Sequence, residues 1–253
     1  MMNGPCTVWA TAMISSHKAS LEAAYVLHSR SYRDNSLLID LFSREHGRLG
    51  AVARGAKQPK SKFNGLLQPF GLLLLSWSGR GELATLTDAE SGQAALNLKG
   101  RSLMSGFYVN ELMTRLLQRH DPHQQLFDVY HETLSMLASG EQEEPVLRRF
   151  EYWLLQETGY GLILDHDIET GEVIQPEAQY CYHIERGPVR VFGTGSKMQG
   201  IVVDGATLLA LQAESLEDPL HLKQAKQLMR AVIAHQLGDR PLRSRELAMQ
   251  KVL

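Results

Sequence analysis

Positive charge without acidic neighbours marks one short segment of the chain. Residues 52–65 read VARGAKQPKSKFNG, with no Asp or Glu. The cations of this segment are Arg54, Lys57, Lys60 and Lys62. Such side chains can neutralise phosphate groups and release counterions, and Phe63 beside them could stack on a base. The pattern is typical of a phosphate-binding loop, although a solvated loop whose lysines only aid solubility explains the composition equally well.

More cations lie near this segment and close to the end of the sequence. Before and after the segment lie Arg44, Arg48 and Arg80. A second basic zone consists of Lys223, Lys226, Arg230, Arg240, Arg243 and Arg245. The formal net charge of the whole chain is only −2. Two basic zones in a nearly neutral chain favour a polyanionic partner more strongly than one zone would.

A different kind of site is suggested by the sequence LRRF at residues 147–150. Arg148 and Arg149 stand here beside Phe150, Trp153 and Leu154. Arginines on a helix surface are usually solvated, and that is the simpler interpretation. The alternative is a basic lip beside an apolar pocket, which would suit the acidic and hydrophobic end of a partner peptide.

The sequence offers little support for catalysis or metal binding. It contains no G-x-S-x-G, H-E-x-x-H or G-x-x-x-x-G-K-[ST] motif, and we expect no enzymatic activity. His166, Asp167, Cys181 and His183 fall in one region, but Cys181 and His183 lack the spacing of a zinc knuckle. We therefore expect no metal and no other cofactor. The chain has only two cysteines, which favours a reducing compartment such as the cytoplasm.

The elements that carry these residues change in type along the chain. Between residues 23 and 90, five short strand-like runs separated by turn signals predict a small barrel, for which an OB-fold, an SH3-like barrel or a plain meander would serve. Helical spacing then dominates, interrupted by a turn-rich segment. The predicted fold class is α+β. The predicted divisions are a disordered extension at 1–20, a barrel at 21–96 and a helical domain at 97–253 with a β-rich insertion at 165–203.

Several stretches in the same order resemble the RecO family of bacterial DNA repair proteins. They are AYVLHSRSYRDNSLLIDLFSREHGRLGAVARGAK, LQPFGLLLLSWSGRGELATL, GFYVNELMTRLL, LRRFEYWLLQETGYG and RPLRSREL. The resemblance implies an OB-fold, a helical domain and a small zinc-ribbon-like insertion. Many members of the family bind zinc there through cysteines, whereas this sequence has only Cys181, and we expect the insertion to be free of metal.

The same resemblance implies a non-enzymatic recombination mediator. Such a protein binds single- and double-stranded DNA, anneals complementary strands and acts with RecR to load RecA on strands coated by single-strand-binding protein (SSB). It also recognises the acidic C-terminal tail of SSB, at the position of Arg148, with Arg149 as a weaker extension. The alternative is an adaptor that the SSB tail recruits and that has only incidental affinity for DNA. We expect a cytoplasmic protein without a membrane segment, because the longest aliphatic run, Leu72–Leu75, is far too short to span a bilayer.

Overall fold

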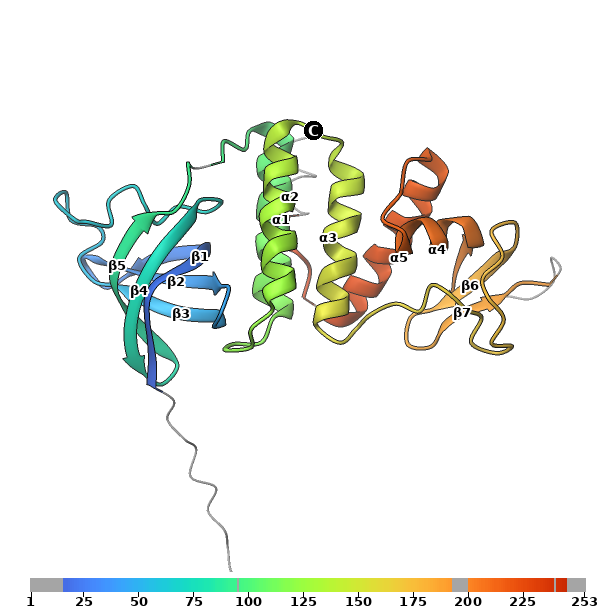
Figure 1. The fold of residues 1–253 in the computed structure, drawn as a ribbon, viewed down its shortest axis with the longest axis horizontal. Coiled ribbons are helices and arrows are strands. Elements are labelled where there is room, and N and C mark those ends of the chain that lie inside the picture. Colours follow the sequence, from blue (N-terminus) through green and yellow to red (C-terminus); the bar gives the residue numbers. More distant parts are fainter. Residues whose placement is uncertain (1–15, 95, 193–199, 239, 245–253) are drawn as a thin grey trace, which may run out of the picture.

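The computed structural model describes residues 16–94, 96–192, 200–238 and 240–244. The molecule is elongated, with a β-barrel at one end, helices in the middle and a small sheet at the other end (Figure 1). No helix in the described part of the chain has the length and hydropathy needed to cross a bilayer.

The barrel is built from five strands that close in the order β1-β2-β3-β5-β4. These strands are β1 (Ser16–Tyr32), β2 (Ser36–Ser43), β3 (Gly47–Ala53), β4 (Leu72–Arg80) and β5 (Leu83–Ser91). A short parallel pairing between β3 and β5 closes the barrel, and all other neighbours are antiparallel. Alternating side chains fill the interior, among them the fully buried Leu41, Leu75 and Trp77. The expected OB-fold is confirmed.

Strand β1 corrects the expected N-terminal extension. It begins at Ser16, so residues 16–20 belong to the barrel, where Ala19 pairs with Trp77 of β4. Pairing with β4 satisfies the backbone polar groups that a disordered segment would leave to water. The remainder of the extension, residues 1–15, lies outside the described residues.

The second half of the chain consists of helices and a small antiparallel sheet. Its helices are α1 (Gly100–Leu116), α2 (Gln124–Ser139), α3 (Glu143–Glu157), α4 (Gly205–Gln212) and α5 (Pro219–Leu237). The sheet has the order β7-β6-β8, from β6 (Gln179–His183), β7 (Gly187–Arg190) and β8 (Ile201–Asp204). The predicted α+β class, with a β-rich insertion within the helical part, is therefore confirmed.

One hydrophobic core joins the barrel to the helices. Tyr25 of β1 and Phe42 of β2 pack against Phe127 and Tyr130 of α2, with ring centroids 4.9 to 6.2 Å apart. Asn110 of α1 adds a buried polar link, since its Nδ2 donates to the Leu27 carbonyl at 2.9 Å and its Oδ1 accepts from Tyr130 Oη at 2.7 Å. These contacts fix the barrel against α1 and α2.

Candidate functional site

The basic segment forms a folded loop on the barrel between β3 and β4. Ala56, Phe63 and Leu67 turn inward and are buried in the barrel core. Successive turns connect these anchors, and the Lys57 amide donates to the Asn35 carbonyl in the β1–β2 connection at 3.1 Å. Because the apolar residues of the loop point inward, its polar residues face solvent.

The cations of the loop differ in how free they are. Arg54, Lys57 and Lys60 are exposed and have no ion-pair partner in the described part of the chain. Lys62 instead contacts Asp88 of β5, with 3.1 Å between Nζ and Oδ1, and donates to the Thr87 carbonyl. The hydrogen bond and charge of Lys62 hold the pKa of Asp88 below its usual value. Three loop cations are thus available to an external anion, while Lys62 is partly committed.

The structure does not support base stacking by Phe63. Its side chain is only 5% exposed because it forms part of the barrel core. Burial removes the apolar surface of this ring from water, which is favourable, but it leaves no free ring face to stack on a base.

The two arginines upstream of the loop hold the barrel against the helices. Arg44 forms a bidentate ion pair with Asp128 of α2. Arg48 is largely buried, and it donates to the Leu117 carbonyl at 3.1 Å and to Asp40 at 3.3 Å. Both guanidinium groups already have intramolecular acceptors, so they are poor candidates for contacts with an external phosphate.

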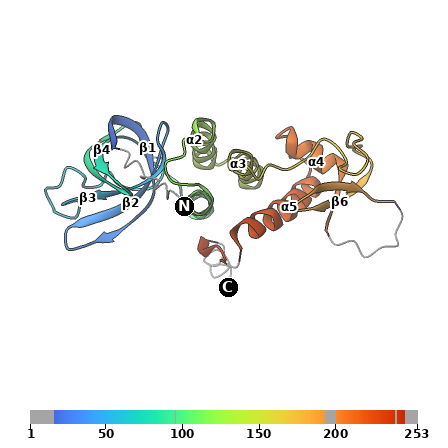
Figure 2. The ribbon, with the colours of Figure 1, turned by 90° about the horizontal axis from the view of Figure 1, so that it is seen from below.

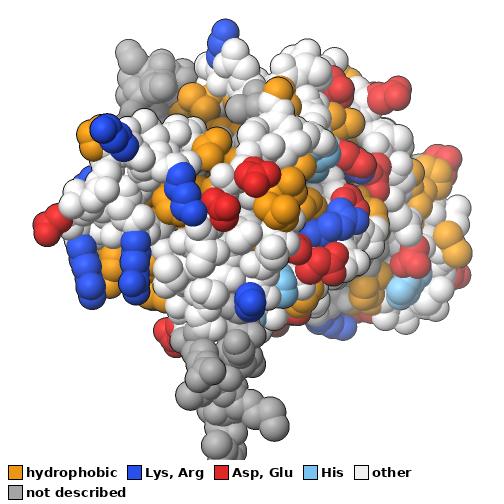
Figure 3. All heavy atoms as spheres, turned by 60° about the vertical axis from the view of Figure 1, so that its left-hand side comes forward, with side chains coloured by type: hydrophobic (Ala, Val, Ile, Leu, Met, Phe, Trp, Pro, Cys, Tyr) orange, Lys and Arg blue, Asp and Glu red, His pale blue; other side chains and the backbone are white. Residues whose placement is uncertain are grey.

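A space-filling view of one face shows where Lys and Arg side chains lie. With the barrel end of the molecule turned forward, Lys and Arg side chains protrude at the barrel side, while Asp and Glu are more frequent towards the helical side (Figure 3). Arg80 ends β4, but its side chain lies outside the described residues, as does all of Arg245.

A second candidate site is a pocket of about 140 Å³ between α1, α3 and α5. Its lining residues are Met104, Ser105, Tyr108, Glu144, Leu147, Arg148, Lys226, Arg230 and Ser244. It thus places Arg148 from the LRRF segment beside Lys226 and Arg230 from the C-terminal basic zone. Sequence separation hid this proximity, which arises because α5 packs against α3.

Arg148 is the buried cation of this basic pocket. Its side chain is 4% exposed, and Nη2 lies 2.6 Å from Oε1 of the fully buried Glu151. The same Oε1 accepts from Tyr108 Oη at 2.5 Å. Nε and Nη1 of Arg148 are buried and have no hydrogen-bond partner among the described residues. Buried donors without partners are costly, so an acceptor that enters the pocket would gain by meeting them.

The exposed rim of the basic pocket is also cationic. Lys226 Nζ lies 2.5 Å from Glu144 Oε1, and Arg230 is exposed. Burial tends to raise the pKa of Glu144, but the hydrogen bond and charge of Lys226, with Arg148 and Arg230 nearby, lower it overall. Glu144 is therefore ionised at neutral pH and offsets only part of the positive charge of the pocket. Lys223 is exposed on α5 outside the pocket.

Arg149 faces away from the basic pocket. Its Nε lies 2.5 Å from Glu214 and its Nη2 lies 2.7 Å from Glu132. Trp153 donates to the same Glu214 at 2.8 Å. Arg149 lies about 100° around α3 from Arg148, and its ion pairs with Glu132 and Glu214 hold its guanidinium outside the basic pocket. The structure brings only Arg148 into the candidate peptide site.

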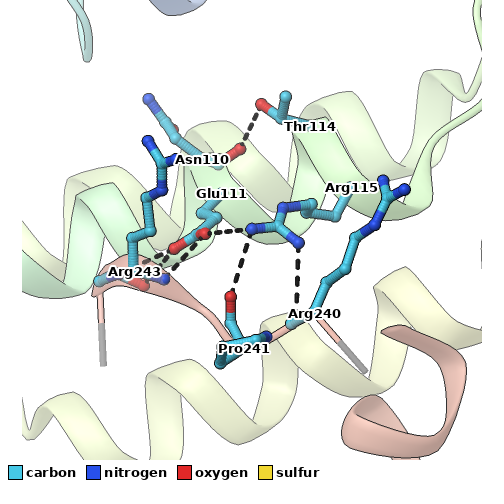
Figure 4. A network of polar contacts seen from close by, with 8 residues as sticks. Asn110, Glu111, Thr114, Arg115, Arg240, Pro241 and Arg243 are labelled. Atoms are coloured by element: carbon cyan, nitrogen blue, oxygen red, sulfur yellow. Dashed lines mark hydrogen bonds and ion pairs between the residues drawn. The ribbon is translucent and has the colours of Figure 1, made fainter. Parts of the chain in front are cut away.

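The C-terminal tail, residues 240–244, is held on α1 by a network that no sequence motif indicates (Figure 4). Glu111 accepts from the amides of Arg243 at 3.0 Å and Ser244 at 2.9 Å, and from Ser244 Oγ at 2.8 Å. Arg115 bonds Glu111 at 3.1 Å and also the carbonyls of Arg240 and Pro241. A Glu–Arg pair four residues apart is common on helices, so this pair alone does not indicate a role in holding the tail.

The network directs two further cations outward. The side chains of Arg240 and Arg243 extend away from Glu111, and both residues are exposed (Figure 4). Seen from below, α5 leads the chain back towards the helices next to the barrel (Figure 2). The tail thereby brings part of the second basic zone close to the barrel.

The described residues of the β-rich region do not fit a zinc ion. No cluster of three or more His, Cys, Asp or Glu in the described part of the chain could hold a metal. Cys181 is buried in β6, and burial raises the pKa of its thiol, which disfavours the thiolate that zinc requires. Asp167 is occupied in a turn, where it accepts from the amides of Glu169, Thr170 and Arg190.

Comparison with known proteins covers nearly the whole chain. Residues 19–94 match the family model described as "Recombination protein O N terminal", and residues 99–246 match "Recombination protein O C terminal". The chain is similar to the protein named DNA repair protein RecO of Nitrosospira multiformis, with 45% identity over 92% of this chain and 96% of that protein. It is also similar to the DNA repair protein RecO of Methylococcus capsulatus, with 48% identity over 90% and 92% of the two chains. The chain therefore belongs to the recombination protein O family.

Proposed function

We propose that this protein is a non-enzymatic mediator of recombination in DNA repair. It binds single- and double-stranded DNA, anneals complementary strands and acts with RecR to help load RecA onto SSB-coated strands in the bacterial cytoplasm. Family membership supports this role. The observation that carries DNA binding is the exposed set Arg54, Lys57 and Lys60, which an OB barrel presents on a folded loop.

Annealing on such a surface requires no bond chemistry. Two strands held on one cationic surface repel each other less, because the lysines and arginines compensate their phosphates. Confinement also raises the effective concentration of one strand around the other. Contacts to phosphates carry no sequence information, so annealing should tolerate any pair of complementary sequences.

An annealing assay with loop variants tests this proposal. We expect the triple change Arg54→Glu, Lys57→Glu and Lys60→Glu to slow the annealing of naked complementary strands at least tenfold. The matched control reverses three committed cations, Arg44→Glu, Lys62→Glu and Arg149→Glu, and should slow annealing less. Equal annealing by the loop variant and the unmodified protein would refute DNA binding through the loop.

The basic pocket around Arg148 favours a second activity, recognition of the SSB tail. A C-terminal carboxylate could accept from the unpartnered Nε and Nη1 of Arg148, while Lys226 and Arg230 attract the acidic residues of the tail. Met104 and Leu147 would contact its hydrophobic side chains. The adaptor alternative corresponds to a protein in which only this pocket is required for function.

Peptide binding separates the two activities. Arg230→Ala should weaken binding of a peptide with the SSB tail sequence by about tenfold, as expected for one charge-assisted contact. Lys223→Ala, an exposed cation on the same helix outside the pocket, is the control and should bind normally. Annealing of naked strands should survive Arg230→Ala, whereas annealing of SSB-coated strands should fall. If the loop variant still annealed both naked and SSB-coated strands, the adaptor alternative would be correct.

A further inference from the structure

An apolar groove lies where the barrel, α1 and the C-terminal tail meet. Its volume is about 590 Å³, within the range of about 300 to 1,000 Å³ found for ligand sites. Leu27 of β1 and Met104 and Phe107 of α1 form apolar walls. Arg243 and Ser244 of the tail form the opposite edge. We call this hollow the junction groove.

The junction groove connects two other hollows. Met104 and Ser244 belong to its walls and also to those of the basic pocket beside Arg148. At the other end, His28 is shared with a hollow of about 240 Å³ on the barrel, whose walls include Arg30 and Arg119. Three adjacent hollows thus follow one another from α5, across α1, to the barrel.

Phe107 is the aromatic residue that the junction groove leaves open. Phe107 is 42% exposed, although its ring packs edge-on against the Phe70 ring, with 5.2 Å between the ring centroids. Of the seven phenylalanines in the chain, all of which are described, only Phe107 and Phe192 are exposed. An exposed ring that already packs against a neighbouring ring can stack on a planar ligand at a reduced cost in side-chain entropy.

The charges around the junction groove suit a phosphate-bearing strand. Arg243 is exposed at its edge, and Arg30 is exposed in the adjoining barrel hollow. Glu111 is the carboxylate in the wall of the groove, and its charge is compensated by Arg115 and by three donors of the tail. Cations that recur along an apolar path match a polymer with a phosphate at every unit, whereas a short acidic peptide would need only the basic pocket.

We propose that the junction groove binds an unpaired base of single-stranded DNA, with Phe107 stacked on the base. Arg243 and Arg30 contact the flanking phosphates, and the strand continues from the barrel towards the basic pocket. This inference rests on the proposed DNA binding and adds the path of the strand and the residue that distinguishes an unpaired base from a duplex. A duplex offers no free base face to the groove.

Two oligonucleotides of equal length and charge test the proposal with the full chain. One is an oligo(dT), and the other has abasic sites in place of all bases. Phe107→Ala removes the ring on which one base stacks, so it should bind oligo(dT) about fivefold more weakly than the unmodified protein does. Its affinity for the abasic strand should be unchanged. Phe192→Ala makes the same substitution at an exposed phenylalanine beside β7, outside the groove, and should leave both affinities unchanged.

Two conservative variants distinguish loss of base stacking from loss of packing within the protein. Phe107→Trp should keep oligo(dT) affinity, and its added fluorescence should be quenched by oligo(dT) but not by the abasic strand. Phe107→Leu keeps an apolar side chain and should weaken oligo(dT) binding as the alanine variant does.

Specific outcomes would overturn the inference. An equal loss on oligo(dT) and the abasic strand would show that Phe107 acts through the fold or through charge placement. Unchanged oligo(dT) binding with loss of acidic-peptide binding would assign the groove to the peptide. If the unmodified protein bound neither oligonucleotide, the proposed DNA binding itself would fail, which is a separate result from failure at Phe107.

Discussion

Arg148 illustrates, at the scale of single residues, how one side chain can serve both the fold and a binding site. Its guanidinium and the Glu151 carboxylate are both buried, and together with Tyr108 they form a polar cluster inside the helical domain. A charge pair in the interior requires both partners, because either ion alone would keep the full penalty of desolvation. Two of the three guanidinium nitrogens remain without partners, which leaves the same residue able to receive an acceptor.

We therefore predict that Arg148→Ala lowers the free energy of unfolding by about 3 to 5 kcal/mol, because it leaves Glu151 as an unpaired buried carboxylate. The triple change Arg148→Met, Glu151→Leu and Tyr108→Phe removes the whole cluster and should restore most of that stability. Denaturant unfolding monitored by circular dichroism measures both values. If Arg148→Ala retained full stability, the pair would have no structural role, and Arg148 would be present for binding alone. For the peptide assay, Arg230→Ala is the cleaner variant.

The candidate residues show what local sequence can and cannot reveal. The spacing of Arg54, Lys57 and Lys60 predicted exposed cations, because a polar loop on a barrel must face solvent. The same local pattern could not show that Arg44 and Arg48 are bonded to Asp128 and Asp40, since those partners depend on how the chain packs. Phe63 is a further case, because tertiary packing buries its ring in the barrel core.

At the scale of elements, the connection between the barrel and the helices depends on a close backbone approach. Gly47 begins β3 with φ +64°, and a Cβ atom there would lie 1.9 Å from the Asp121 carbonyl oxygen. Beside it, the His120 amide donates to the Arg48 carbonyl at 2.8 Å. Glycine is needed here both for its left-handed backbone and for the missing side chain.

Two glycine variants test how much the close backbone contact at Gly47 contributes to stability. We expect Gly47→Ala to reduce the free energy of unfolding by about 2 to 4 kcal/mol, from backbone strain and overpacking together. Gly65→Ala is the matched control, because Gly65 has φ +76° but nothing within 4 Å of an added Cβ. Its cost should be about 1 kcal/mol, from strain alone. Equal midpoints of thermal unfolding for the two variants would show that β3 can move away from the α1–α2 connection without loss of stability.

Docking of the C-terminal tail should depend on pH through Glu111. Burial tends to raise the pKa of this carboxyl, but hydrogen bonds from Ser244 and Arg243 and the charge of Arg115 lower it overall. A carboxyl whose pKa is depressed in the folded protein stabilises it above the unfolded pKa, about 4.3. That stabilisation is lost as the pH falls through the lower, folded value.

We predict that the Arg243 and Ser244 amides are protected from hydrogen exchange at neutral pH and lose protection below about pH 4, after correction for intrinsic exchange. Glu111→Gln should show weak protection at neutral pH with little dependence on pH. Glu90→Gln, at an exposed position on β5, is the control and should behave as the unmodified chain. Protection that persisted unchanged into acid would mean that the carboxylate does not hold the tail.

The elements themselves could be predicted to different degrees. The run SLLIDLFS matches β2, Ser36–Ser43, because its strand propensity is high and turn residues border it on both sides. The strand-like runs were expected from residue 23 onward, yet β1 runs from Ser16 to Tyr32. Register shifts between Ala19 and Glu22 and between Val26 and His28 break the alternation of polar and apolar residues, so no regular pattern marked its length.

At the scale of the whole molecule, the available cations form a distributed surface. The barrel loop carries Arg54, Lys57 and Lys60, the tail carries Arg240 and Arg243, and α5 carries Lys223 outside the basic pocket. The tail returns from α5 to α1 and so reduces the distance between the two basic zones of the sequence (Figure 2). Neutral overall composition is therefore compatible with binding a polyanion, because many of the other charges are committed to ion pairs within the chain.

Salt dependence should report how many of these cations meet phosphates. Each phosphate contact with a single strand contributes about −0.7 to the slope of log K against log salt concentration. Replacing Arg54, Lys57 and Lys60 by Ala should therefore make the slope less steep by about 2, because three contacts are lost. Titration of a labelled oligonucleotide at several salt concentrations measures this slope. Replacement of Lys62, Arg44 and Arg149 by Ala removes the same number of charges from committed positions and should change the slope much less. Equal changes in the two variants would mean that net charge, and not the loop surface, governs binding.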